Sequence, residues 1–378
     1  MKIYFQSLFF CFLFLFGSQA CFGQKIKYDV GAKRLRPFRD SVDKFLKEKN
    51  LNLTVGISIA ELKEYQTHSE GFYIFYSNDK KEDSLYKNRL EKFPTMSVYK
   101  FHLALAILKE VDKGKFDLND ELFITKWDLL EETYSPLRDN LKKEYAEEYE
   151  EKVKNGVSIK LSELLSYTVS KSDNNVCDIL FRYLGGKAYT SQQKSKEKKS
   201  KNELSESEIV ELRKKYNQKG AEKTNKFIQK LGLKNTIIAA SEEKMHETFD
   251  DQYLNTTTPT DAVLLLKHFY QGNILEKETR DFLWKIMVET QTGSNKLKAG
   301  LPQKETIILG HKTGSSFRKE PKEGEEFGLK AAENDIGIVV TPTKSYAIAI
   351  FIKNSNESNE VNNALIAELS KMIYEFLD

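Results

Sequence analysis

Segments with the pattern of β-strands occur only near the two ends of this chain. β-Branched and aromatic residues gather in residues 53–60 and 71–76, and again in residues 306–309, 335–341 and 345–353. The segments between them carry apolar residues at helical spacing, as does the C-terminal segment: residues 101–111, 161–169, 176–184, 225–231, 260–270, 279–288 and 359–377. We therefore expect one antiparallel sheet built from both chain ends, with a helical domain inserted in the middle.

This order of elements predicts a two-domain protein of the α/β plus all-α class. We expect residues 24–95 and 287–378 to form the α/β sheet domain and residues 96–286 to form the helical domain. Hydrophobic residues make up 40% of the sequence, which is enough for a sizeable core. Three charged segments interrupt the pattern, and we interpret them as solvated surface insertions in preference to a partner-binding arm: residues 142–154, 187–220 and 317–330.

Residues 1–23 have the pattern of an export signal. Lys2 precedes the apolar run 8–16, and small and polar residues follow up to Gly23. Cleavage after Gly23 predicts a secreted, periplasmic protein; the alternative is a lipoprotein modified at Cys21, which the three residues before that cysteine disfavour. The apolar run is too short to cross a bilayer, so we expect no stable membrane insertion.

Charge and cysteine content exclude several classes of function. Lysine and arginine number 59 against 56 aspartate and glutamate, so no bulk field attracts nucleic acid. Loss of the signal would leave Cys177 as the last cysteine, which rules out an intrachain disulfide and a cysteine-built metal site. The five histidines form no close cluster of the kind that zinc enzymes use. We therefore expect no metal and no other cofactor.

Ser97 and Lys100 stand one helical turn apart at the start of the predicted helix 101–111. A serine hydroxyl is a poor nucleophile until a neighbouring base takes its proton, and a desolvated lysine can do so. The non-helical residues 93–96 place Ser97 at a helix N-terminus, where free N–H groups favour an oxyanion. The spacing alone is not specific, because it recurs at Ser41/Lys44, Ser191/Lys194, Ser195/Lys198, Ser241/Lys244 and Ser316/Lys319.

Two further motifs follow in a fixed order. Ser172-Asp173-Asn174 lies between two predicted helices, where it also fits an ordinary helix cap. Lys312-Thr313-Gly314 lies on a late strand, where a lysine can simply mark an edge, although Gly314 allows a substrate close to the backbone. Ser-x-x-Lys, Ser-Asp-Asn and Lys-Thr-Gly in this order are the motif set of class A β-lactamases and penicillin-binding proteins.

With these motifs in place, the chain resembles class A β-lactamases over nearly all of its mature length. It is most similar to the cephalosporinase-rich subgroup found in Bacteroidetes-type bacteria. Five blocks carry the resemblance: residues 93–102, 134–136, 172–175, 311–314 and 332–337. The resemblance implies the two-domain serine β-lactamase/transpeptidase-like fold, with the site in the cleft between the domains.

The resemblance also implies four catalytic residues. Ser97 attacks the lactam carbonyl, and Lys100 shares the proton chemistry with Glu242 as the alternative base for acylation. Glu242 activates the water for deacylation, and Ser172 relays a proton to the lactam nitrogen. Glu242 belongs to segment 240–246, which resembles the loop that carries this base in the family. The alternative interpretation is an ordinary exposed loop, because Glu243 and Glu247 make this part of the chain acidic.

The substrate-binding residues follow from the same resemblance. Asn174 holds the acyl-amide side chain, and Tyr134 forms a wall of the pocket. His246 occupies the position at which most class A enzymes have an asparagine that helps to hold the deacylating water. Asn255 marks the far end of the loop. The substrate carboxylate is expected at Lys312, Thr313 and Ser315, with Lys296 as a further contact and Gly314 between them; backbone N–H groups of Ser97 and Ser315 form the oxyanion hole.

The expected activity is therefore hydrolysis of the β-lactam amide of penicillins and cephalosporins, by a monomer that binds a small-molecule substrate. A D-alanyl-D-alanine peptidase or penicillin-binding protein shares the three motifs but lacks effective deacylation. A non-catalytic envelope protein that binds a partner through its lysine-rich insertions is the alternative of a different class. The segment 317–330 lies beside the expected pocket mouth, so substrate preference stays open.

Overall fold

The computed structural model describes residues 36–62, 71–77, 90–186 and 205–377. The predicted export signal, the alternative lipidation site at Cys21 and residues 187–204 of the second charged segment lie outside the described residues. Within the described part of the chain, no helix is both long and apolar enough to cross a membrane.

Both ends of the chain contribute to one five-stranded sheet, as the sequence predicts. Its order is β2-β1-β9-β8-β7 and every neighbouring pair is antiparallel. The strands are β1 Thr54–Glu61, β2 Gly71–Ser77, β7 Ile308–Ser315, β8 Lys330–Val340 and β9 Ser345–Ser355. The predicted combination of an antiparallel sheet and a helical region is confirmed, while the exact domain limits stay predictions.

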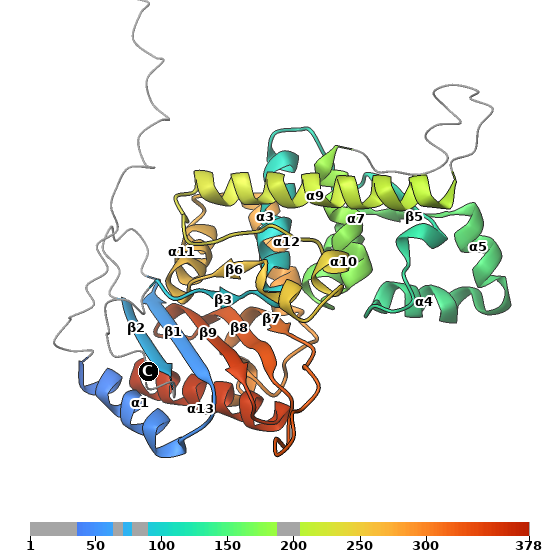
Figure 1. Cartoon of the computed structure of the whole chain (residues 1–378). Coiled ribbons are helices and arrows are strands. Elements are labelled where there is room, and N and C mark those ends of the chain that lie inside the picture. The colour runs from blue at the N-terminus through green and yellow to red at the C-terminus, as the bar shows by residue number, and fades with distance from the viewer. Residues whose placement is uncertain (1–35, 63–70, 78–89, 187–204, 378) are drawn as a thin grey trace, which may run out of the picture.

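The sheet is covered on both faces (Figure 1). Helices α1 (Arg36–Lys49) and α13 (Asn359–Leu377) pack on one face, and the helical region packs on the other. Side chains of β9 alternate accordingly: Ile348 and Ile350 belong to the core beneath α1 and α13, and Ala349 and Phe351 to the core shared with the helices. Burial on both faces explains why this strand reads as a continuous apolar run.

The helical region surrounds α3 (Tyr99–Asp112), which the 3₁₀ turn η1 (Met96–Val98) precedes. Ten consecutive residues of α3, from Tyr99 to Leu108, are buried. The other elements are β3 Phe93–Pro94, β4 Glu121–Ile124, η2 Lys126–Asp128, α4 Pro136–Tyr145, η3 Ala146–Glu148, α5 Tyr149–Asn155, β5 Val157–Lys160, α6 Leu161–Val169, α7 Asn174–Gly185, α9 Glu206–Lys230, α10 Glu242–Met245, η4 Asp250–Tyr253, β6 Thr256–Thr257, α11 Pro259–Tyr270, α12 Lys277–Val288 and η5 Leu297–Gly300.

Helix α9 (Glu206–Lys230) extends beyond the helical segment expected at residues 225–231 and into the charged segment 187–220. It is one helix of 25 residues, with a capping box at Ser205 and Glu208, and it lies along the outside of the helical region (Figure 1). Gly220 does not end it. A Cβ atom on Gly220 would lie 2.0 Å from the carbonyl oxygen of Phe181, so this glycine allows close contact between α9 and α7.

The late strands also differ in their limits. The strand expected at 335–341 begins at Lys330, because its backbone pairs with β9 as far as Ser355. Backbone pairing therefore continues through charged residues that the sequence pattern assigned to a solvated segment. Part of that segment, including Lys330, is buried.

We expect Gly220→Ala to destabilise the protein by about 2–3 kcal/mol, because the added methyl group forces α9 away from α7. Thermal unfolding followed by circular dichroism measures this as a melting temperature lower by about 3–4 °C. Lys226→Ala, at an exposed position of the same helix, is the matched control and should change little. An equal shift in both variants would contradict the close-contact explanation.

Candidate active site

The predicted site residues meet where η1 and α3 face the end of strand β7. Gly314 makes this approach possible, because a Cβ atom there would lie 2.6 Å from the carbonyl oxygen of Thr95. Asn334 of β8 secures the same junction through its side-chain amide, which donates to the carbonyl oxygens of Pro94 and Thr95 at 2.8 and 3.2 Å. Strand and helix start are thus fixed relative to one another.

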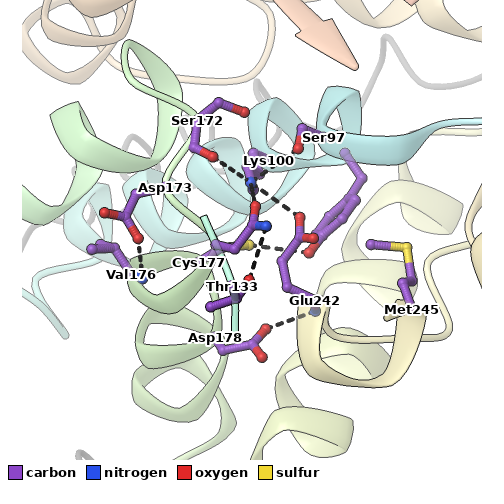
Figure 2. Close-up of polar contacts among 12 residues, drawn as sticks. Ser97, Lys100, Thr133, Ser172, Asp173, Val176, Cys177, Asp178, Glu242 and Met245 are labelled. Atoms are coloured by element: carbon purple, nitrogen blue, oxygen red, sulfur yellow. Dashed lines mark hydrogen bonds and ion pairs between the residues drawn. The ribbon is translucent and has the colours of Figure 1, made fainter. Parts of the chain in front are cut away.

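Lys100 is the centre of the site and is fully buried. Its ammonium donates to Ser97 Oγ at 3.0 Å, to the carbonyl oxygen of Ser172 at 2.8 Å and to Asn174 Oδ1 at 2.5 Å (Figure 2). Glu242 Oε1 lies 3.1 Å from the same nitrogen. An ammonium has three hydrogens for these four neighbours, and Glu242 is held both by charge and by a hydrogen bond.

Glu242 is the acid of its loop that faces the nucleophile. It is 2% exposed, whereas Glu243 forms a bidentate ion pair with Arg213 and Glu247 pairs with lysines at the surface. Burial raises the pKa of Glu242, but the charges of Lys100 and His246 outweigh it and hold that pKa below its usual value. The carboxyl is therefore ionised at neutral pH.

Two buried side chains hold the segment that carries Glu242. Asp178 accepts from the backbone N–H groups of Glu242 and Glu243 at 2.8 and 2.9 Å, at the start of α10 (Figure 2). Asn255 accepts from the N–H groups of Ala239 and Ala240 and donates to the carbonyl oxygen of Ala240. These contacts fix the segment that carries Glu242 from both sides.

His246 is close to Glu242, as the resemblance implied. Its Nδ1 lies 2.7 Å from the backbone oxygen of Glu242 and 3.7 Å from Oε2. A cavity of about 170 Å³ opens beside these residues, with the following lining: Leu130, Glu132, Thr133, Asn174, Asn175, Asp178, Glu242, Glu243, His246 and Glu247. Glu242 is thus next to an open space.

Ser172 connects two lysines. Lys312 is fully buried, and its ammonium donates to Ser172 Oγ at 2.8 Å, while Lys100 binds the backbone oxygen of the same residue. Burial, followed by the charge of Lys100, lowers the pKa of Lys312 well below its usual value. Ser172 has φ +59°, an uncommon backbone conformation for a non-glycine residue that turns its hydroxyl and carbonyl toward the site.

The helix-cap interpretation of this motif is also correct, and Asp173 is the residue that forms the cap. Its carboxylate caps α7 by accepting from the N–H of Val176 at 3.0 Å and also accepts from the N–H of Leu137 at 2.7 Å and the hydroxyl of Ser135. The central residue of the motif is structural. The residues on either side of it, Ser172 and Asn174, face the lysines.

The residues expected at the substrate carboxylate gather at the end of β7. Thr313 is buried and shares a 2.6 Å hydrogen bond with Thr292, and Ser315 is exposed. The Lys296 ammonium is buried in an ion pair with Glu333. The backbone of Tyr134 is held next to the Ser172-Asp173-Asn174 motif, because its carbonyl oxygen accepts from the N–H of Asn174 at 3.0 Å. The residue itself is 55% exposed.

Sequence reasoning did not single out five residues that the structure places here: Thr133, Asp178, Thr292, Glu333 and Asn334. Asp178 had a usable signal, because it follows Asn174 by four residues and so shares its helix face. Glu333 and Asn334 were within a block used for the resemblance, but their contacts depend on strand register. Thr133 and Thr292 are loop residues with no pattern to mark them.

Comparison with known proteins gives concordant matches. The sequence family described as the beta-lactamase enzyme family matches residues 56–223 and 217–377. Beta-lactamase VEB-1 of Pseudomonas aeruginosa is 35% identical over 309 residues, which is 81% of this chain and 84% of that protein. A beta-lactamase of Bacteroides uniformis is 35% identical over 297 residues, covering 78% of this chain and 82% of that protein.

Solved structures agree with the sequence matches. The TLA-1 extended-spectrum beta-lactamase has a TM-score of 0.68 and 35% identity, covering 90% of this chain and 98% of that one. A representative class A beta-lactamase from Bacteroides cellulosilyticus has a TM-score of 0.68 and 33% identity, covering 91% and 98%.

The buried Asp178 predicts a pH dependence of stability. Burial, together with the charge of Glu242, raises its pKa to about 7, against about 4 in an unfolded chain. The folded state therefore binds more protons between pH 4 and 7, so this group stabilises the protein less as pH rises through that window.

We expect the unfolding free energy of the unsubstituted protein, relative to Asp178→Asn, to fall by a few kcal/mol, on the order of 3, between pH 5 and pH 8. Urea unfolding of both proteins at each pH measures this difference and cancels the other titrating groups. A difference that stays constant or grows with pH would show that Asp178 is ionised throughout.

Proposed function

This chain belongs to the beta-lactamase enzyme family, in its class A group, and from that premise we propose how its own residues hydrolyse a β-lactam. The enzyme is a hydrolase that opens the lactam amide and thereby confers antibiotic resistance. The observation that supports our assignment of roles is the position of Lys100 Nζ, 3.0 Å from Ser97 Oγ and 3.1 Å from Glu242 Oε1.

Ser97 is the nucleophile. Its Oγ attacks the lactam carbonyl carbon, and its proton passes either to Lys100 or, through a water molecule, to Glu242. The low pKa of Glu242 leaves its carboxylate free to accept a proton at neutral pH, so Lys100 acts as base only after its own proton has moved to that carboxylate. Both routes use the same three side chains.

The lactam nitrogen receives its proton from Ser172. The hydroxyl of Ser172 accepts a hydrogen bond from Lys312, so its own hydrogen can point to the substrate. Lys312 can then replace the proton that Ser172 donates, because burial has already lowered its pKa. Backbone N–H groups of Ser97 and Ser315 stabilise the developing oxyanion.

Glu242 is the base for deacylation. It takes a proton from a water molecule whose oxygen attacks the acyl carbon; the bond from that carbon to Oγ then breaks, and the proton returns through Lys100 to Ser97 Oγ. Glu242 Oε1 lies 3.1 Å from Lys100 Nζ, and a carboxylate oxygen has a second lone pair that can accept from that water. His246, whose Nδ1 is 3.7 Å from the other oxygen, helps to hold the carboxylate in place.

The remaining residues hold the substrate. Asn174 binds the acyl-amide group: its side-chain NH2 has two hydrogens, and one of them is donated to Thr133 at 3.1 Å. Lys312 and Thr313 meet the substrate carboxylate, and the exposed Tyr134 forms a wall of the pocket. A preference for cephalosporins agrees with the resemblance to cephalosporinases, and we place the mature monomer in the periplasm.

Turnover of a chromogenic cephalosporin by the purified protein tests these roles. Ser97→Ala should lower kcat/KM by more than about 1,000-fold, since it removes the nucleophile. Glu242→Gln should lower kcat by about 100-fold or more and accumulate an acyl adduct that mass spectrometry detects, since acylation then outpaces deacylation.

Two matched variants serve as controls. Ser41→Ala alters another Ser-x-x-Lys pair, on an exposed face of α1, and should keep full activity. Glu243→Gln removes the neighbouring acid, which pairs with Arg213, and should accumulate no adduct. A stable adduct without turnover in the unsubstituted protein would instead indicate a penicillin-binding protein, and a protein that never reacts would indicate the non-catalytic alternative.

The export signal gives a separate prediction. Mass spectrometry of the protein from the periplasmic fraction should give a chain that begins at Gln24, because cleavage is expected after Gly23. A membrane-bound chain that begins at Cys21 and carries the mass of a lipid would show that the lipoprotein alternative is right.

A further inference from the structure

The end of strand β7 is joined to a buried acid that the enzymatic roles above do not use. Glu333 lies on β8 directly opposite Ser315 in the strand register and is 3% exposed. Its Oε2 accepts from the Ser315 hydroxyl and lies near Lys330 Nζ, both at 3.0 Å, and its Oε1 pairs with Lys296. One carboxylate therefore holds three groups at the place where a substrate carboxylate is expected.

Glu333 is ionised in this arrangement. Burial alone would raise its pKa, but Lys296 and Lys330 together hold the pKa below its usual value. Both lysines are almost completely buried and direct other hydrogens to backbone oxygens, Lys330 to Ser316 and Lys296 to Asn334. Arg318 is the further cation whose charge interacts with this carboxylate.

The hydrogen of Ser315 is committed to Glu333. A serine hydroxyl has one hydrogen, so a hydroxyl that donates to Glu333 offers only lone pairs to a substrate. Lone pairs repel a carboxylate and accept from a neutral donor. The ammonium of Lys296, which the resemblance placed near the substrate carboxylate, is likewise already paired.

We propose that Glu333 is a specificity-determining residue that weakens binding of the carboxylate next to the lactam nitrogen, and so lowers the preference of the site for lactams that carry this charge over lactams in which the group is uncharged. This inference rests on the proposed function. Glu333 acts in two ways: it takes the hydrogen of Ser315 and neutralises Lys296. Lys312 and Thr313 are left as the donors to an anionic substrate.

Equilibrium binding to Ser97→Ala protein isolates this effect from acylation. The probes are a cephalosporin with a free ring carboxylate and the methyl ester of the same compound, each titrated by calorimetry. Adding Glu333→Gln should tighten binding of the acid by about 10-fold, because a negative charge within a few ångströms is removed, and change binding of the ester by less than about twofold.

Glu333→Asp retains the charge and should keep the acid-to-ester affinity ratio within about threefold of the parent ratio. Asp128→Asn is the matched control, because it neutralises another buried acid, the partner of Arg182 far along the sequence from β7, and should leave the ratio unchanged. If Glu333→Gln does not fold, Glu333→Gln/Lys330→Gln removes one charge of each sign. Ser315 then loses its charged acceptor and Lys296 its charged partner, so the ratio should rise.

An unchanged ratio in the folded glutamine variant, or equal weakening of acid and ester, would show that Glu333 is only structural. Turnover by the protein with Ser97 intact is measured separately. Absence of turnover there contradicts the proposed function, whereas the binding ratio still decides the role of Glu333.

Discussion

The ammonium of Lys100 is the contact on which the rest of the site depends. It joins Ser97, the turn before α7 and the loop that carries Glu242. The first and last of these parts are more than one hundred residues apart in the sequence. A buried ammonium without partners is strongly unfavourable, so these segments stabilise the charge and the charge in turn fixes the segments. Asp178 and Asn255 then secure the loop that carries Glu242, and Asn334 secures the segment before α3.

The arrangement of the sheet could be predicted because strand patterns were confined to the chain ends. The apolar run of β9 and the helical spacing of α3 are strong local signals. The limits of α9 and β8 could not be predicted, because they depend on contacts with distant residues. Gly220 lies inside a helix that a glycine would ordinarily weaken, because α9 must pack closely against α7 at this position. Lys330 can be buried in a strand because the charge of Glu333 compensates its own.

Residues of the site were predictable where a short motif carries them, as for Ser97, Lys100 and Lys312. Their geometry agrees with the roles expected, since each contacts another member of the motif set. Glu242 required family resemblance, because Glu243 has the same composition around it; the ion pair of Glu243 with Arg213 separates the two in space. The role of Glu333 could not be predicted from the sequence. Glu333 lies opposite Ser315 only because of the register in which β7 and β8 pair, and the long loop between these strands does not reveal that register.

The pairing of β1 with β9 has a consequence for how the protein forms. Thr54 pairs with Lys353, so the centre of the sheet closes only when the last quarter of the chain is available. Contacts of such large sequence separation slow folding, because the entropy of closing a long loop must be overcome first. A nascent chain would therefore remain without its central strand pair until synthesis is nearly complete. A premature stop near the C-terminus would leave β1 as an exposed edge prone to aggregation.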